Sequence, residues 1–167
     1  MSLAAAPASP PIVTERPKDA SAVDALILRA FGPGRFAKAA ERLREGRAPR
    51  LDLSFVAWDG GRIVASVRQW TVKVGASPSI FLGPIAVETD YRSQGLGAAL
   101  IERACEAVAR AGCSTIVLVG DTPFFGPLGF VAAPHVLMPG PVDRRRVLAR
   151  ALQPSADQAL EGLVRPA

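Results

Sequence analysis

The sequence predicts an α+β domain built around one mixed sheet. Two helical patterns come first, over residues 18–31 and 32–46. From residue 51 the hydrophobic period changes from helical to alternating, and Asp59-Gly60 suits the tight turn of a hairpin. A strand, a long amphipathic helix and another strand follow between residues 78 and 120. Helices, then hairpins, then a strand–helix–strand unit are typical of the α+β class.

One globular domain accounts for the length and composition of the chain. Its 167 residues suffice for one core of ordinary size, and 49% of them are hydrophobic against 21% charged. The Pro/Ala-rich start lacks the basic region and the continuous apolar core of a secretory signal. We therefore expect a flexible arm at residues 1–10, one domain at 11–152 and a C-terminal tail at 153–167.

The boundaries of the elements follow from apolar runs that end at glycine, proline or aspartate. A first strand is expected at residues 11–16, and the two helices that follow end near Gly32 and Gly46. The later strands are expected at residues 51–58, 62–74, 78–87 and 114–120, with weaker candidates at 130–138 and 145–152. Residues 154–166 resemble a weak helix and tail, suited to covering a sheet edge or to a dimer contact.

The helix that follows Gly95 is predicted to be amphipathic. At about 100° per residue, its charged and apolar side chains fall on opposite arcs. The charged arc holds Glu102, Arg103, Glu106 and Arg110, and the apolar arc holds Leu100, Ile101, Ala104, Val108 and Ala111. Its apolar face should therefore pack on the sheet, with Cys105 as a small core residue.

Two glycines, Gly95 and Gly97, lie in the turn before this helix, together with Arg92. A helix N-terminus presents unpaired N–H groups and a partial positive charge, and glycines let a phosphate approach them closely. A tight strand-to-helix connection is the alternative explanation for the glycines. A dinucleotide fingerprint needs a third glycine where Leu100 stands, and no Gly-Lys-Ser/Thr loop occurs.

These residues carry a family resemblance. The stretch "IAVETDYRSQGLGAALIERA" resembles motif A of the GCN5-related N-acetyltransferases, in which Arg/Gln-x-x-Gly-x-Gly/Ala follows an apolar strand. "FLGPIAV" is similar to the fourth strand of that fold. "STIVLVGDTPFFGPLGF" is similar to its fifth strand and the short helix after it, ending in Gly129-Phe130. The match covers about residues 12–152 and is most like the YhbS-like bacterial branch.

The resemblance implies a three-layer α/β arrangement, with a twisted mixed sheet and helices on both faces. It also implies that acetyl-CoA lies between the fourth and fifth strands, where its pantetheine arm pairs with the main chain like an added strand. The residues implied for the pantetheine are Ile85, Ala86 and Val87, and those for the diphosphate are Arg92, Ser93, Gln94, Gly95, Leu96, Gly97 and Ala98. Backbone N–H groups around Val87 would stabilise the thioester oxygen.

The chain departs from the family at the usual general acid. That acid is a tyrosine four residues before the Gly-Phe pair, and here Phe125 occupies the place. Phenylalanine has no proton to donate, and the sole tyrosine, Tyr91, lies on the other side of the glycine turn. Asp121 is a candidate to orient or deprotonate the amine, with capping of the short helix as its alternative role. His135 and water are the remaining proton carriers.

Other features narrow the class of protein. With two cysteines and one histidine, neither a disulfide framework nor a zinc site is expected, and a reducing cytoplasm is the default. The net charge of +5 is moderate and the basic residues are scattered, so nucleic acid is not an expected partner. No apolar run approaches the roughly 18 residues needed to span a bilayer, so a membrane is not expected either. Trp70 is an equal candidate for core packing and for lining an acceptor pocket.

Three functions remain in competition. The first is an acetyl-CoA-dependent N-acetyltransferase acting on a small-molecule or peptide amine, as a monomer or a homodimer. The second is an acyl-CoA-binding module that has lost catalysis along with its tyrosine. The third is a basic nucleic-acid-binding protein, which the charge alone favours.

Overall fold

The computed structural model describes residues 9–32, 39–153 and 160–167. Residues 1–8 of the predicted arm, residues 33–38 of the expected second helix and residues 154–159 of the expected C-terminal helix lie outside the described residues. No helix among the described residues is long and apolar enough to cross a membrane.

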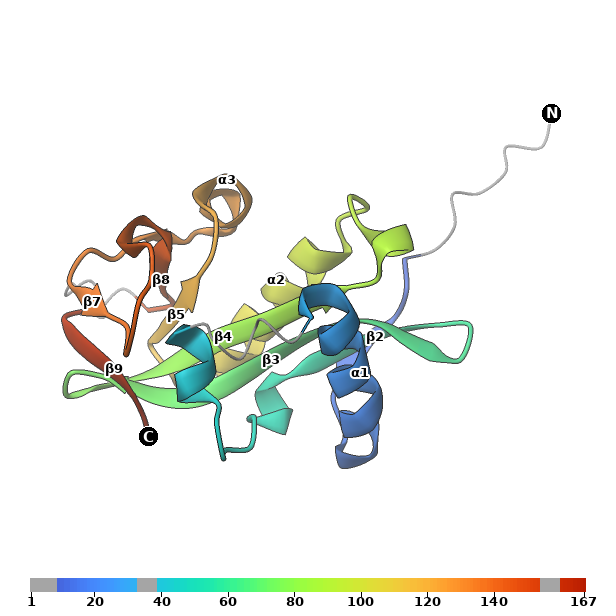
Figure 1. The fold of residues 1–167 in the computed structure, drawn as a ribbon. Coiled ribbons are helices and arrows are strands. Elements are labelled where there is room, and N and C mark those ends of the chain that lie inside the picture. Colours follow the sequence, from blue (N-terminus) through green and yellow to red (C-terminus); the bar gives the residue numbers. More distant parts are fainter. Residues whose placement is uncertain (1–8, 33–38, 154–159) are drawn as a thin grey trace.

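One mixed sheet organises the chain (Figure 1). Its strands are β1 (Ile12–Thr14), β2 (Phe55–Asp59), β3 (Arg62–Val74), β4 (Ser77–Val87), β5 (Thr115–Val119), β6 (Val131–Ala132), β7 (Val136–Leu137), β8 (Val147–Ala151) and β9 (Gly162–Pro166). The order across the sheet is β1-β2-β3-β4-β5-β8-β6, and neighbours along this path are antiparallel except β4 and β5. The parallel pair exists because a helix, α2 (Leu96–Arg110), connects the two strands.

Helices cover both faces, as the resemblance implies. The side chains of each strand alternate between two sides, so Phe55 and Ala57 meet α2 whereas Val56 meets α1 (Ala20–Phe31). The cluster on the α2 side also receives Phe125 from α3 (Thr122–Phe125). A 3-10 segment, η3 (Ala39–Leu43), lies with α1 on the opposite face. Figure 1 shows α1 in front of the sheet and α2 behind it.

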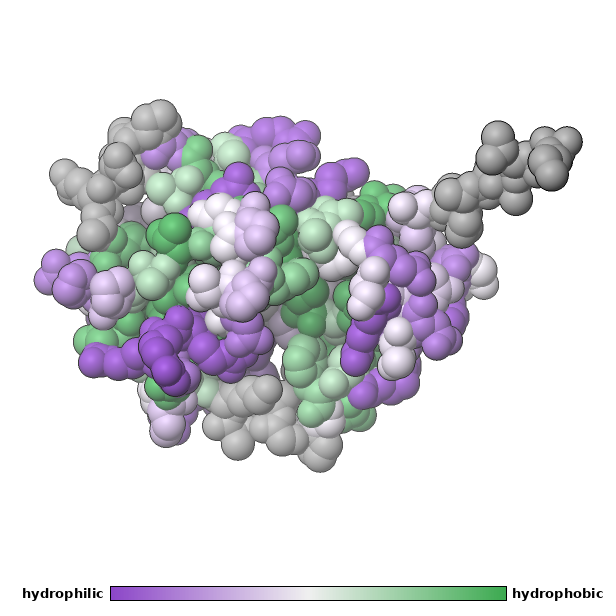
Figure 2. Space-filling view, turned by 90° about the horizontal axis from the view of Figure 1, so that it is seen from above, coloured by the Kyte–Doolittle hydropathy of each residue, from purple (hydrophilic) through white to green (hydrophobic). Residues whose placement is uncertain are grey.

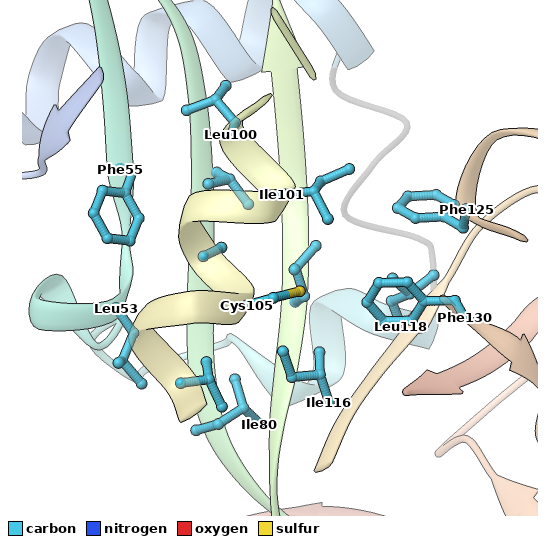
Figure 3. Close-up of a cluster of buried hydrophobic side chains, with 14 of the residues drawn as sticks. Leu53, Phe55, Ile80, Leu100, Ile101, Cys105, Ile116, Leu118, Phe125 and Phe130 are labelled. Atoms are coloured by element: carbon cyan, nitrogen blue, oxygen red, sulfur yellow. The ribbon is translucent and has the colours of Figure 1, made fainter. Parts of the chain in front are cut away.

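The amphipathic pattern of α2 predicts its packing correctly over the length of the helix. Its predicted apolar residues from Leu100 to Val108 are fully buried, and its four predicted charged residues are exposed (Figure 3). Ala111 is the exception: the helical period predicts it on the apolar arc, but it is exposed, because the helix ends at Arg110. Cys105 lies in the core of this face.

The hairpin differs from the prediction at two places. The expected strand at 51–58 begins at Phe55, because residues 51–53 form a 3-10 turn. In that turn, Ser54 Oγ donates to the Arg50 carbonyl and Gln69 Nε2 donates to the Leu53 carbonyl. The two-residue loop of the hairpin is Gly60-Gly61, both with positive φ, and Asp59 is paired with Arg62. The turn is of the primed kind, displaced by one residue from the expected position.

The end of the chain enters the sheet. Residues 162–166, which the sequence places in a tail, form β9, and β9 pairs with β3 at Val72–Val74. This is the end of β3 that β2 does not reach, since β2 pairs with residues 62–67. In the expected second helix at 32–46, Ala39–Leu43 form a 3-10 helix and residues 44–46 form a turn.

Candidate active site

The two parallel strands separate in the middle of the sheet. β4 and β5 are in register at Ile80↔Ile116 and Phe81↔Val117, after which β4 continues for six more residues. The separation coincides with an irregularity in β4. Val67 pairs with Ile85 and Gln69 with Leu82, so the single residue between them on β3 faces the two residues Gly83 and Pro84. Such a bulge bends a strand and turns it away from its neighbour.

A cavity of about 500 Å³ occupies the opening. It extends through the sheet, because its walls include residues from both of the core clusters that flank the sheet. Leu82, Leu118 and Phe125 come from the α2 side, whereas Phe81 and Ala39 come from the α1 side. Figure 2 looks down on the end of the molecule that carries α3, where apolar residues are exposed in the middle of the face between more polar ones.

The predicted diphosphate turn borders this opening. α2 begins at Leu96, and Gly95 precedes it in the left-handed conformation, with φ 81°. Ser93 also has a positive φ of 63°, so two residues of the turn lie in a region that glycine tolerates best. Residues 92–95 are exposed. The first turn of α2 reaches the cavity wall through Phe124, which lines the cavity and lies next to Gly97. The geometry that anion binding at a helix N-terminus needs is therefore in place.

The two glycines of the turn serve different purposes. A Cβ at Gly95 would meet nothing within 4 Å, so its conformation, not lack of space, favours glycine there. Gly97 lies in the first turn of the helix, where a Cβ would be 3.6 Å from Cζ of Phe124 and 3.9 Å from Cγ2 of Val87. These are ordinary contacts, so a methyl group fits but a branched side chain is crowded.

Arg92 supports the turn instead of extending from it. Its Nε donates to the Val87 carbonyl at 3.1 Å, which ties the start of the turn to the end of β4. Gln94 Nε2 donates to the Asp90 carbonyl, closing the turn from within. Glu88 accepts from Arg29 of α1 at 2.6 Å. These side-chain hydrogen bonds therefore fix the segment between β4 and α2.

The residues implied for the pantetheine lie beyond the bulge. Ile85 to Val87 pair with β3 along one edge, and the described part of β5 does not reach the other edge. Ile85 lines the cavity, whereas the side chain of Ala86 is buried against α1. Val87 packs on the α2 side and lies next to Gly97. An extended ligand can therefore pair with the main chain here, as an added strand would.

Asp121 makes a different contact from the one that its capping role requires. It occupies the N-cap position of α3, but its side chain makes no capping hydrogen bond. Its Oδ1 instead accepts from Nε of Arg146 at 3.0 Å. Both residues line the cavity. The side chain of Asp121 is 70% exposed, so solvent screens this ion pair and its contribution to stability is small.

Phe125 is a packing residue on the α2 side of the cavity. It is 8% exposed, and its ring contacts Phe124 and Phe130 edge to face, with centroids 4.8 Å and 5.7 Å away. The ring lies so close to Gly120 that a Cβ there would overlap it. Figure 3 shows Phe125 and Phe130 beside Leu118, at the edge of the core formed with α2. The sequence identifies Gly120 as a strand boundary and misses this contact.

The other candidates named from the sequence do not line the cavity. His135 is exposed and does not line the cavity. The hydroxyl of Tyr91 donates to Asp59 in the hairpin, and this hydrogen bond raises the pKa of Tyr91. Trp70 is buried in the core cluster on the α1 side, and its Nε1 donates to the Gly83 carbonyl at 2.6 Å.

Three charged residues that the sequence analysis does not assign to a site line the cavity, namely Arg44, Asp143 and Arg146. Arg44 comes from the segment after α1, and its side chain is 9% exposed and paired with Glu41. Asp143 and Arg146 come from the Arg-rich stretch at 143–146, where residues 144–146 form a 3-10 helix. The residues next to Arg44 and Arg146 in the sequence do not indicate a site, because the two arginines reach the cavity from segments that are far apart in the chain. No group of metal-binding side chains occurs in the described ranges.

The separated parallel strands and the bulge of β4 meet at one opening of the sheet, in a fold that known proteins share. The Acetyltransferase (GNAT) family matches residues 22–130 of the chain. The chain therefore belongs to the GNAT acetyltransferase family.

Particular relatives come from bacteria. The uncharacterised N-acetyltransferase YhbS of Escherichia coli K12 is 33% identical over 127 residues, which cover 74% of this chain and 75% of YhbS. The crystal structure of E. coli YhbS in complex with CoA matches with a TM-score of 0.82 at 28% identity, covering 98% of this chain and 93% of that one. A GNAT acetyltransferase of Brucella melitensis, in complex with acetyl-CoA, has the same fold, with a TM-score of 0.70 at 24% identity over 94% and 95% of the two chains. The predicted GNAT fold is confirmed.

Proposed function

We propose that the protein is an N-acetyltransferase that takes its acetyl group from acetyl-CoA and transfers it directly to a primary amine of a small molecule or peptide. The observation that supports this most is the separation of β4 from β5 after Phe81 and Val117, which opens a cavity through the sheet beside the N-terminus of α2. Such an opening lets two substrates meet from opposite faces. The CoA-bound YhbS and the acetyl-CoA-bound B. melitensis enzyme make acetyl-CoA the first donor to test.

The donor would enter from the side of α2 and α3. The turn from Arg92 to Ala98 offers main-chain N–H groups at a helix N-terminus, which suit a diphosphate. The open edge of β4 from Ile85 to Val87 suits the amides of a pantetheine arm. In this arrangement the thioester would reach the bulge at Gly83 and Pro84, where the cavity crosses the sheet.

The acceptor would enter from the side of α1 and η3. Phe31, which is 42% exposed, and the nearly buried guanidinium of Arg44 line this part of the cavity. Asp121 and Arg146 provide a pair of opposite charges at its margin. Aromatic surface and fixed charges close together suit an amine that carries further polar groups. We assign the orientation of this amine to Asp121, one of the two carboxylates that line the cavity.

The transfer has a simple balance of bonds and protons. The neutral amine nitrogen attacks the thioester carbon, and the C–S bond breaks as the C–N bond is made. The amine loses a proton and the thiolate gains one. Main-chain N–H groups beyond the bulge would stabilise negative charge on the carbonyl oxygen. Phe125 has no proton to donate and is buried among other rings, so we assign the protonation of the thiolate to water.

Direct binding is the first test. Acetyl-CoA titrated into the protein should give heat in calorimetry and raise the melting temperature. A ligand at 100 times its dissociation constant stabilises the folded state by about 2.7 kcal/mol. If saturating acetyl-CoA gives neither heat nor a shift, the donor assignment is wrong.

Turnover is the second test, and it separates catalysis from binding. Release of free thiol from acetyl-CoA should be measured against a panel of amines, amino acids and peptides. The protein should be present at catalytic concentration, so that its own partly exposed Cys113 adds little to the thiol signal. Acetylated product identified by mass spectrometry would confirm the reaction.

A second candidate function is an acyl-CoA-binding module without catalysis. The phenylalanine at position 125, where the family has a tyrosine, favours it. Binding of acetyl-CoA without thiol release, against the full panel and across pH 6–10, would support this module over the enzyme.

A further inference from the structure

A buried tryptophan forms a hydrogen bond with the bulge of β4. Trp70 lies in the middle of β3, is 7% exposed and packs in the core cluster on the α1 side. Its Nε1 donates to the Gly83 carbonyl at 2.6 Å, a short and buried hydrogen bond. Within the low dielectric of the core, such a bond is stronger than at the surface.

The carbonyl that Trp70 holds belongs to the segment on which the opening depends. Gly83 has a φ of 138° and lies two residues beyond the last register pair with β5. Gly83 lines the cavity, whereas Trp70 does not. The hydrogen bond therefore keeps the Gly83 oxygen directed toward the buried indole.

The direction of this oxygen matters for chemistry at the bulge. An oxygen facing the cavity would carry partial negative charge toward the place where the thioester oxygen becomes negative. The next residue, Pro84, has no N–H, so Ile85 supplies the first main-chain donor after the bulge. The ring of Pro84 fixes its φ, so holding the Gly83 carbonyl in one direction also limits the directions in which the Ile85 N–H can point.

We propose that Trp70 is a positioning residue of the acyl-transfer site: its indole N–H keeps the Gly83 carbonyl away from the reacting oxygen and aims the donors that begin at Ile85. This inference rests on the proposed N-acetyltransferase function. It assigns to Trp70 a role in the rate of acyl transfer that is separate from its role in core packing.

The experiment removes the N–H while keeping the shape of the ring. Trp58 is first changed to phenylalanine, because Trp58 and Trp70 are the two tryptophans of the chain. Trp58→Phe is also the matched control, since Trp58 is a partly buried residue of β2 outside the cavity. Benzothienylalanine, in which sulfur replaces the indole N–H, is then incorporated at position 70. Trp70→Phe provides a genetically encoded version.

We expect the loss of the indole N–H to lower kcat and to leave KM for acetyl-CoA almost unchanged. Relative to the control, kcat should fall by roughly five- to tenfold, as for loss of one buried hydrogen bond expressed in the transition state. KM for acetyl-CoA should stay within about twofold, because the diphosphate turn is untouched. A lower melting temperature with unchanged kcat would overturn the proposal, since that is what a packing role alone predicts.

Affinity measurements separate this proposal from the proposed function. Calorimetry should compare acetyl-CoA with CoA in the control and in the analogue, because donors aimed at the acetyl oxygen act on acetyl-CoA alone. A drop in the preference for acetyl-CoA supports the role of Trp70 even where turnover is too slow to measure. An unchanged preference and an unchanged kcat refute the role and leave the enzyme assignment standing. A wild-type protein that binds neither ligand refutes both.

Discussion

The glycine turn permits a prediction in which two neighbouring glycines respond in opposite ways to the same substitution. Gly95 has a left-handed backbone and free space around its Cα, whereas Gly97 lies in the helix with neighbours at contact distance. A left-handed conformation costs a non-glycine residue about 1–2 kcal/mol. Gly95→Ala should therefore destabilise the protein by about that amount. Gly97→Ala should leave stability unchanged or raise it by about 0.5–1 kcal/mol, since alanine favours a helix.

The same positions should differ in their effect on acetyl-CoA. At Gly97, valine adds two methyl groups beside Phe124 and Val87 and covers the start of α2. A hydrogen bond to a charged group contributes about 1.5–3 kcal/mol. Loss of one such bond to a phosphate would therefore weaken acetyl-CoA binding by about 10- to 150-fold in Gly97→Val. Gly97→Ala is the matched control, and its affinity should lie between those of the wild type and Gly97→Val.

Two measurements decide the question. Urea denaturation gives the free energy of unfolding of each variant without ligand, and calorimetry gives the dissociation constant of acetyl-CoA. Gly97→Val should remain folded and bind poorly. If it folds and binds as tightly as the wild type, Gly97 serves backbone packing alone and the diphosphate lies elsewhere. If Gly95→Ala is as stable as the wild type, the conformational argument for that glycine is wrong.

Three further predictions concern the acid, the core and the thiols. Phe125→Tyr should raise kcat by a few-fold, well below the 10²–10⁴ of an optimally placed acid, in thiol-release assays across pH 7–10; a slower variant that still binds acetyl-CoA would show that Phe125 shapes the cavity instead. Arg68 donates to Glu15, whose side chain is fully buried. Arg68→Met should therefore lower the free energy of unfolding, measured in urea, by about 3–5 kcal/mol, because it leaves a buried charge without its partner. Adding Glu15→Leu to this variant should recover most of the loss. Burial raises the pKa of Cys105 to about 11, so at pH 8 only about one Cys105 thiol in a thousand is ionised. A thiol reagent should therefore label Cys113 well before Cys105 in the folded protein. Equal labelling rates, measured by mass spectrometry, would contradict the burial of Cys105.

The elements that the sequence determines by itself are those specified by neighbours along the chain. The helix at 96–110 follows from a period of 3.6 residues and from the glycines before it, and its buried and exposed faces are as predicted. The hairpin follows from alternation and a glycine turn. The motif at 92–98 indicates the GNAT family, because it is a specific order of residues within a short segment. Each of these signals is complete within about 20 residues.

The tertiary structure decides what depends on segments far apart in the chain. Trp70 and Gly83, Asp121 and Arg146, and β3 with β9 are pairs of this kind. A single tryptophan or arginine carries the same local pattern whether it packs in a core, lines a cavity or faces solvent. Its role is selected by burial and by the partner that the fold brings within hydrogen-bond distance. The glycine turn could thus be found by inspection of the sequence, whereas the cavity beside it exists because β4 and β5 separate, and that separation depends on the packing of the whole sheet.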